Sequence, residues 1–74
     1  MDVRRQLGLN VQRMRREKGW SQEALAFESG LHHTYISGIE RGVRNPTVTV
    51  VQKLSKTLGT STGSLLDAPA RKPR

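Results

Sequence analysis

Residues 21–45 read SQEALAFESGLHHTYISGIERGVRN, and this stretch decides how the chain folds. Ser21 is a good N-cap for a helix over residues 22–29, and Gly30 can take the left-handed backbone conformation that ends a helix. A second helix over residues 33–41 follows, because its two isoleucines have the spacing of one helical face. Two short helices joined by a tight turn make a helix-turn-helix, which the sequence therefore predicts.

The segments on either side of this unit also favour helices. Apolar residues recur at helical spacing over residues 3–18, and Gly19 ends that run. Residues 47–58 begin with β-branched residues, which favour a strand locally, but the later leucines return to helical spacing. We predict a helix there, since a lone strand would have no partner, and Ser61 can cap a last short turn. The sequence thus predicts a compact all-α fold of five helices.

Length and composition limit the chain to one small domain. It has 74 residues, of which 34% are hydrophobic, so the core must be small and aliphatic. We expect residues 1–66 to form the domain. Residues 67–74 read DAPARKPR and should form a disordered basic tail, because they contain proline and charge but no apolar anchor. A separate ligand-sensing domain does not fit, so neither a small-molecule ligand nor a cofactor is expected.

The net charge of +7 favours a polyanionic partner. The excess lies at the two ends, with +4 over residues 1–18 and +3 over residues 69–74, rather than in the helix-turn-helix. The absence of cysteine excludes disulfides and thiolate metal sites. No apolar run reaches membrane-spanning length, so we expect no membrane contact and a cytoplasmic, nucleoid-associated location.

The start of the helix over residues 33–41 carries the candidate base contacts. Recognition in the major groove of DNA needs donors and acceptors on one helix face near its N-terminus. His33, Thr34 and Ser37 lie at positions i, i+1 and i+4 and meet this need. The imidazole can donate to guanine, and the threonine can use its hydroxyl or place its methyl on thymine. The alternative is that all three are ordinary solvated residues.

Polar residues around the motif are candidates for contacts with DNA phosphates. Arg44 and Asn45 follow the second helix, where the chain would return to the DNA backbone. His32 either caps that helix or contacts phosphate, and Tyr35 either reaches phosphate or packs half-buried. Arg41 is a phosphate candidate or a solvated surface charge.

The joint spacing of several short motifs resembles the lambda repressor and Cro-like helix-turn-helix family, also called the XRE family. These motifs are Arg15, Ser21-Gln22-Glu23, Leu25-Ala26, Gly30-Leu31, Tyr35-Ile36-Ser37, Ile39-Glu40-Arg41-Gly42 and Asn45-Pro46. The likeness covers residues 7–66, and LHHTYISGIERGVRNP is especially similar to the small controller proteins of restriction–modification systems. The resemblance implies the five-helix fold, double-stranded DNA as the partner, a dimeric habit and no catalytic activity.

The same resemblance implies roles for three further residues. Arg15 and Glu40 are expected to form a partly buried ion pair between the helices over residues 3–18 and 33–41. The Gln22 amide is expected to contact a phosphate and to support the base-reading helix. Candidates for a contact between two copies are apolar residues late in the chain, with the core of one copy as the competing role: Leu65, Leu66, Val48 and Val50.

These observations predict a sequence-specific DNA-binding transcriptional regulator, a homodimer that binds a pseudo-palindromic operator with residues 33–41 in the major groove. An enzyme is disfavoured, because His32 and His33 point about 100° apart on a helix and no third metal ligand or nucleophile–base pattern accompanies them. The chain therefore offers no catalytic or metal-binding residues. An antitoxin-type interaction module on the same fold is the alternative, although it would be expected to carry a long hydrophobic extension. RNA binding is disfavoured by the lack of aromatic stacking platforms.

Overall fold

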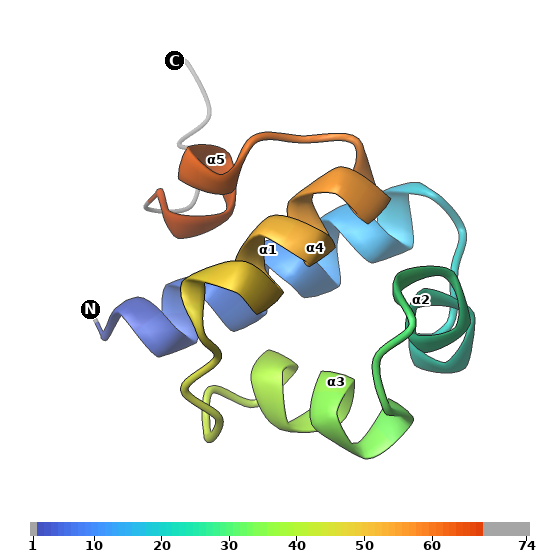
Figure 1. Ribbon diagram of the computed structural model, residues 1–74, viewed down its shortest axis with the longest axis horizontal. Coiled ribbons are helices and arrows are strands. Elements are labelled where there is room, and N and C mark those ends of the chain that lie inside the picture. Colours follow the sequence, from blue (N-terminus) through green and yellow to red (C-terminus); the bar gives the residue numbers. More distant parts are fainter. Residues whose placement is uncertain (1, 68–74) are drawn as a thin grey trace, which may run out of the picture.

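The computed structural model describes residues 2–67, which form five α-helices and no strand (Figure 1). The helices are α1 (Val3–Glu17), α2 (Gln22–Ser29), α3 (His33–Glu40), α4 (Val48–Leu58) and α5 (Thr62–Leu66). The predicted all-α architecture is confirmed, including a helix rather than a strand after Pro46. The predicted disordered tail is residues 67–74; Asp67 is described and ends α5, and residues 68–74 lie outside the described part of the chain.

Local hydrogen bonds explain where most of the helices begin. The side chains of four N-cap residues accept a backbone N–H from the first turn of their helix, which satisfies donors that the helix itself leaves free. These residues are Asp2, Ser21, Thr47 and Ser61. At Asp2, hydrogen bonds from the side chain and backbone of Arg4 lower the pKa of the carboxyl group. The starts of these helices are therefore set by one or two residues each.

One aliphatic core holds the five helices together. α1 and α4 lie across the middle of the molecule, α2 and α3 cover one side, and α5 covers the other end (Figure 1). The core is built from residues of every helix: Leu7, Val11, Leu25, Ala26, Ile36, Ile39, Val51, Leu54, Leu58 and Leu65. Trp20 and Tyr35 are half-buried against it. The apolar face of each helix is thus used, while the outer faces stay free.

Gly8 allows α1 to cross α3 in close contact. A Cβ atom at this position would meet the carbonyl oxygens of Ile39 and Glu40, the latter at 2.7 Å. Backbone atoms cannot move aside as the end of a flexible side chain can. A glycine that lowers the intrinsic stability of α1 is therefore required by the packing of α3.

Gly8→Ala should lower the free energy of unfolding by about 1–3 kcal/mol, because the added methyl group overpacks the α1–α3 crossing. Urea denaturation followed by circular dichroism measures this change. Gly63→Ala is the control, since the nearest heavy atom to an added Cβ there is 4.0 Å away. Equal stability of the Gly8 variant and wild type would contradict the close crossing.

Candidate nucleic-acid interface

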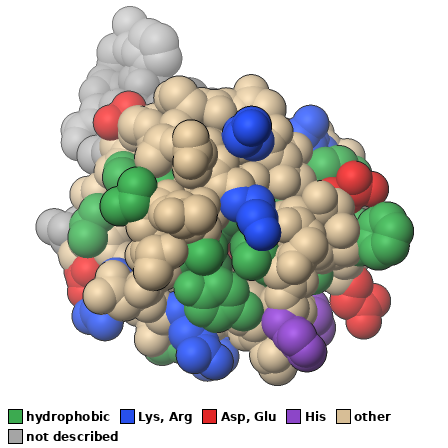
Figure 2. Space-filling model, in the orientation of Figure 1, with side chains coloured by type: hydrophobic (Ala, Val, Ile, Leu, Met, Phe, Trp, Pro, Cys, Tyr) green, Lys and Arg blue, Asp and Glu red, His purple; other side chains and the backbone are tan. Residues whose placement is uncertain are grey.

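α3 presents a polar edge to solvent and buries its opposite face. His33 and Thr34 are exposed, and Ser37 is half-exposed. Ile36 and Ile39 are almost completely buried, at 0% and 1% exposure, and fix the rotation of the helix about its axis. Figure 2 shows the histidine side chains projecting at the edge of the molecule where α3 begins. The three predicted base-contacting residues therefore lie together on an accessible edge.

His32 occupies the N-cap position of α3 but makes no capping hydrogen bond. Its Nδ1 lies instead 3.4 Å from the hydroxyl oxygen of Thr34. His32 is therefore the N-cap residue by position but does not cap α3 with its side chain, and its role toward phosphate stays a prediction. The first N–H groups of α3 lack a side-chain cap and carry the partial positive charge of a helix N-terminus, which attracts anions.

Arg15 and Glu40 form the ion pair that the resemblance implies. Arg15 donates from Nε to Glu40 Oε2 at 2.7 Å and from Nη2 to Oε1 at 3.0 Å, so the contact is bidentate. Its Nη1 donates to the carbonyl oxygen of Trp20 at 2.8 Å. Both charged groups are buried, and the hydrogen bond to Glu40 raises the pKa of Arg15. The pair fixes α3 against α1 and against the turn that leads to α2.

Gln22 completes this network from the start of α2. Its Nε2 donates to Glu40 Oε1 at 2.9 Å, so one carboxylate joins residues of α1, α2 and α3. The amide thus supports α3 directly. Whether the same side chain also contacts a phosphate stays a prediction.

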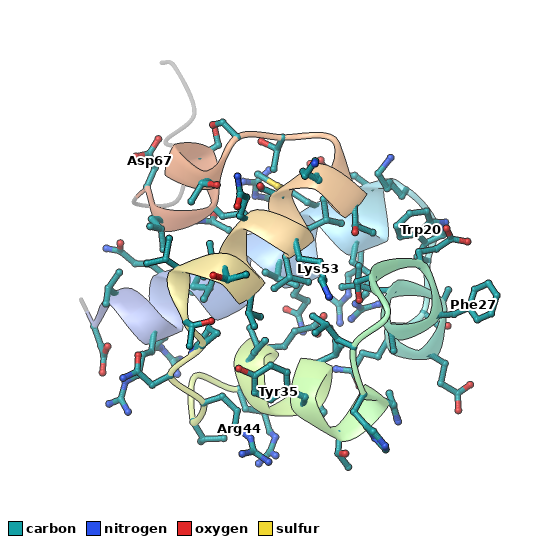
Figure 3. All side chains as sticks on the ribbon, in the orientation of Figure 1. Trp20, Phe27, Tyr35, Arg44, Lys53 and Asp67 are labelled. Carbon is teal, nitrogen blue, oxygen red and sulfur yellow. The ribbon has the colours of Figure 1, made fainter. Side chains whose placement is uncertain are left out.

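Arg44 lies along α3 in a position that the spacing of the sequence did not indicate. Its Cγ fills the space over Gly38, where an added Cβ would come within 2.6 Å. Its guanidinium sits 5.5 Å from the centre of the Tyr35 ring, within the range of a cation–π contact. Figure 3 shows the two labelled side chains near each other, Tyr35 on α3 and Arg44 in the loop that follows it. The sequence signal was a glycine inside a helix, on the face with the polar residues.

The remaining phosphate candidates border this surface. Arg41 and Asn45 are both exposed, and they lie at the end of α3 and in the loop that follows it. Tyr35 packs half-buried against the core, as one of its two predicted roles requires. Arg41 and Asn45 thus place polar groups beyond the end of α3 that is opposite His33.

The residues predicted to contact a second copy separate into two groups. Leu65 is completely buried inside one copy, so its assignment to an interface is wrong, and Val50 is half-buried against the core. Val48 and Leu66 are 78% and 39% exposed. They line an apolar groove of about 210 Å³ between α1, α4 and α5. Val3 of α1 is among the other residues that line it. The groove, rather than Leu65, is the candidate contact surface.

Within residues 2–67, no group of three histidine, aspartate or glutamate side chains is arranged to hold a metal ion. None of the described helices is both long and apolar enough to cross a bilayer.

Comparison with known proteins connects this surface to a family. The family model described as helix-turn-helix matches residues 11–65. Control protein C.BamHI of Bacillus amyloliquefaciens is 48% identical over 67 residues, which cover 89% of this chain and 83% of that protein. The crystal structure of the hypothetical transcription factor NHTF from Neisseria is 40% identical, covers 92% of this chain and 78% of its own, and superposes with a TM-score of 0.89.

A further solved structure contains DNA. It is the restriction–modification controller protein C.Esp1396I, a tetramer in complex with its natural 35 base-pair operator. That protein is 37% identical to this chain, the match covers 88% of this chain and 86% of that one, and the TM-score is 0.79.

Glu40→Ala should lower the free energy of unfolding by about 3–5 kcal/mol, because it leaves the Arg15 guanidinium buried without its carboxylate. Thermal and urea denaturation measure the loss, which in a domain of this size could prevent folding at 25 °C.

The matched control is Glu28→Ala, which removes an exposed glutamate of α2 and should change stability by less than about 0.5 kcal/mol. A loss below about 1 kcal/mol for Glu40→Ala would contradict the importance assigned to the network.

Proposed function

Because this chain belongs to the helix-turn-helix family of XRE-type DNA-binding transcriptional regulators, we propose that it binds a pseudo-palindromic operator as a homodimer. The observation that carries this proposal is the free polar edge of α3, held on a buried support by Glu40 and its partners. Two copies related by a two-fold axis would place two α3 helices in successive major grooves about 34 Å apart. Such a regulator would act in the cytoplasm, on the nucleoid.

His33, Thr34 and Ser37 are the proposed base contacts. They are the polar side chains that α3 exposes within its first five residues, where the recognition helix of this motif meets base edges. Each offers a hydroxyl or a ring nitrogen, and Thr34 also has a methyl group that fits a thymine. Their side chains would determine which base pairs are preferred.

The proposed phosphate contacts set the position of α3 on the duplex. They surround the base-contacting residues at the start of α2, the start of α3 and the loop after α3: Gln22, His32, Tyr35, Arg41, Arg44 and Asn45. Contacts of this kind supply affinity and orientation but little sequence information. Arg44 is the best supported of them, because Gly38 and Tyr35 already hold its side chain beside α3.

The groove between α1, α4 and α5 supports the homodimer. Val48 and Leu66 expose apolar surface there, and a chain of this size gains stability by burying it against a second copy. Val3 lines the same groove and is 54% exposed. These three residues are the proposed centre of the dimer contact.

The Thr34→Ala, Ser37→Ala double variant tests the assignment of the reading edge. An operator is first obtained by selecting bound DNA from a random pool with the wild-type protein, and footprint length reports the number of copies bound. The variant should lose about tenfold or more of its preference for the operator over scrambled DNA, since base contacts contribute about 1–3 kcal/mol of discrimination. Electrophoretic mobility shifts on both DNAs measure this ratio.

Thr49→Ala is the control, because Thr49 is an exposed threonine on α4, away from the edge. Non-specific affinity should stay within twofold in both variants. If the double variant keeps the wild-type preference, these residues do not read bases.

Gly38→Ala tests the placement of Arg44. The new methyl group would lie 2.6 Å from the Arg44 Cγ, which is too close, and would push the guanidinium away from Tyr35. We expect the affinity for operator DNA to fall as far as it does in Arg44→Ala, while the melting temperature changes little. The double variant Gly38→Ala, Arg44→Ala should bind operator DNA no more weakly than Arg44→Ala alone. Additive losses would mean that Gly38 acts independently of Arg44.

A further inference from the structure

Asn10 is a buried polar residue of α1 that the proposed DNA contacts do not use. It is 1% exposed, and a buried amide is stable only when its donors and acceptor are hydrogen-bonded. Its Nδ2 donates to the carbonyl oxygens of Leu65 and Asp67, each at 2.8 Å. Its Oδ1 accepts a hydrogen bond from Arg13 at 3.3 Å. Both N–H groups of the amide therefore donate to carbonyl oxygens at the C-terminal end of α5.

α5 needs this external support. It has five residues, and helices of that length are not stable by themselves in water. α2 and α4 end at Gly30 and Gly59, whose left-handed conformation lets backbone N–H groups close the last turn. α5 ends instead at Asp67 in an extended conformation. Its last carbonyl groups therefore need outside partners, and Asn10 provides them from α1.

α5 in turn forms one wall of the apolar groove. Thr62 and Leu66 line the groove, opposite Val3 of α1 and Val48 of α4. Leu65, between them in sequence, is completely buried and packs in the core. α5 packs on α1 and α4, and α3 packs on α1 and α2, while α4 also contacts α1 and α2. Undocking of α5 would thus remove Leu66 from the groove and uncover Leu65, while the hydrogen bonds of Glu40 would still join α3 to α1 and α2.

We infer that Asn10 is a positioning residue for self-association. Its amide docks α5 in the register that creates the groove, and so controls two-site DNA binding without touching the DNA or the second copy. The inference rests on the proposed homodimer, which it extends by assigning the residue that shapes the contact surface. The carbonyl partners of Asn10 lie 55 and 57 positions further along the chain.

Asn10→Asp is the test, because aspartate has the same shape but replaces the NH2 group, with its two N–H donors, by an oxygen atom that repels the carbonyl groups of α5. Gln12→Glu makes the same amide-to-carboxylate change two residues along α1. The Gln12 side chain is half-buried, and no hydrogen bond from it is found among residues 2–67. Three quantities are measured for both variants and wild type. NMR gives the hydrogen-exchange rates of the amides, and sedimentation equilibrium gives the dimer dissociation constant. Binding titrations give the affinities for DNA with one and with two half-sites.

In Asn10→Asp we expect exchange of the α5 amides to rise at least tenfold while the amides of α2 and α3 keep their protection. The dimer dissociation constant should rise at least tenfold, and affinity for the two-half-site operator should fall with it. Affinity for a single half-site should stay within twofold, which a general loss of stability would not allow. Gln12→Glu should match wild type throughout.

The inference would be overturned if the α5 amides of Asn10→Asp exchanged as slowly as in wild type, or if the dimer dissociation constant were unchanged. Complete unfolding of both Asn10→Asp and Asn10→Ser, which keeps one donor, would also overturn it, because Asn10 would then hold the whole fold. The wild type tests the proposed function separately. If it stays monomeric on its operator, the homodimer fails and this inference falls with it; if it dimerises and Asn10→Asp dimerises equally well, only the inference fails.

Discussion

The carboxylate of Glu40 accepts hydrogen bonds from Arg15 and Gln22, and the placement of α3 depends on it. A buried charge is stable only when it is paired and fully hydrogen-bonded, so the relative positions of α1, α2 and α3 have little freedom. Arg15 extends the same constraint to the turn after α1 through the carbonyl of Trp20. This network therefore holds α3 in one orientation and keeps its exposed edge in place. A surface that reads DNA must be held rigidly in this way.

At both ends of the molecule, hydrogen bonds of a buried polar side chain hold a helix in place, and each helix belongs to a different proposed surface. At the α3 end, charged and amide groups of α1 and α2 fix the surface proposed to meet DNA. At the α5 end, the amide of Asn10 fixes a helix too short to stand by itself, and with it the groove proposed for a second copy. Two glycines complete the arrangement at the α3 end, since Gly8 admits the backbone of α3 and Gly38 admits the side chain of Arg44.

Much of the helical architecture was predictable because its causes are local. Ser21, Thr47 and Ser61 act within three residues of their own position, and Gly30 needs only its own backbone freedom. Periodic apolar residues indicated which helix faces would be buried. Local reasoning did not succeed at every position: His32 stands where a cap belongs, yet its ring lies beside Thr34 and makes no capping bond.

The sequence by itself determined the five helices, the turn between α2 and α3 and the polar composition of the α3 edge, because capping, spacing and residue type are short-range properties. The tertiary structure alone decided that Leu65 belongs to the core while Leu66 reaches the surface. It also decided that Asn10 meets the end of α5 and that Arg44 lies over Gly38. The places of Leu65, Leu66 and Asn10 depend on how helices cross, and a crossing joins residues whose separation along the chain carries no signal of their contact. The place of Arg44 depends on the path of the loop after α3.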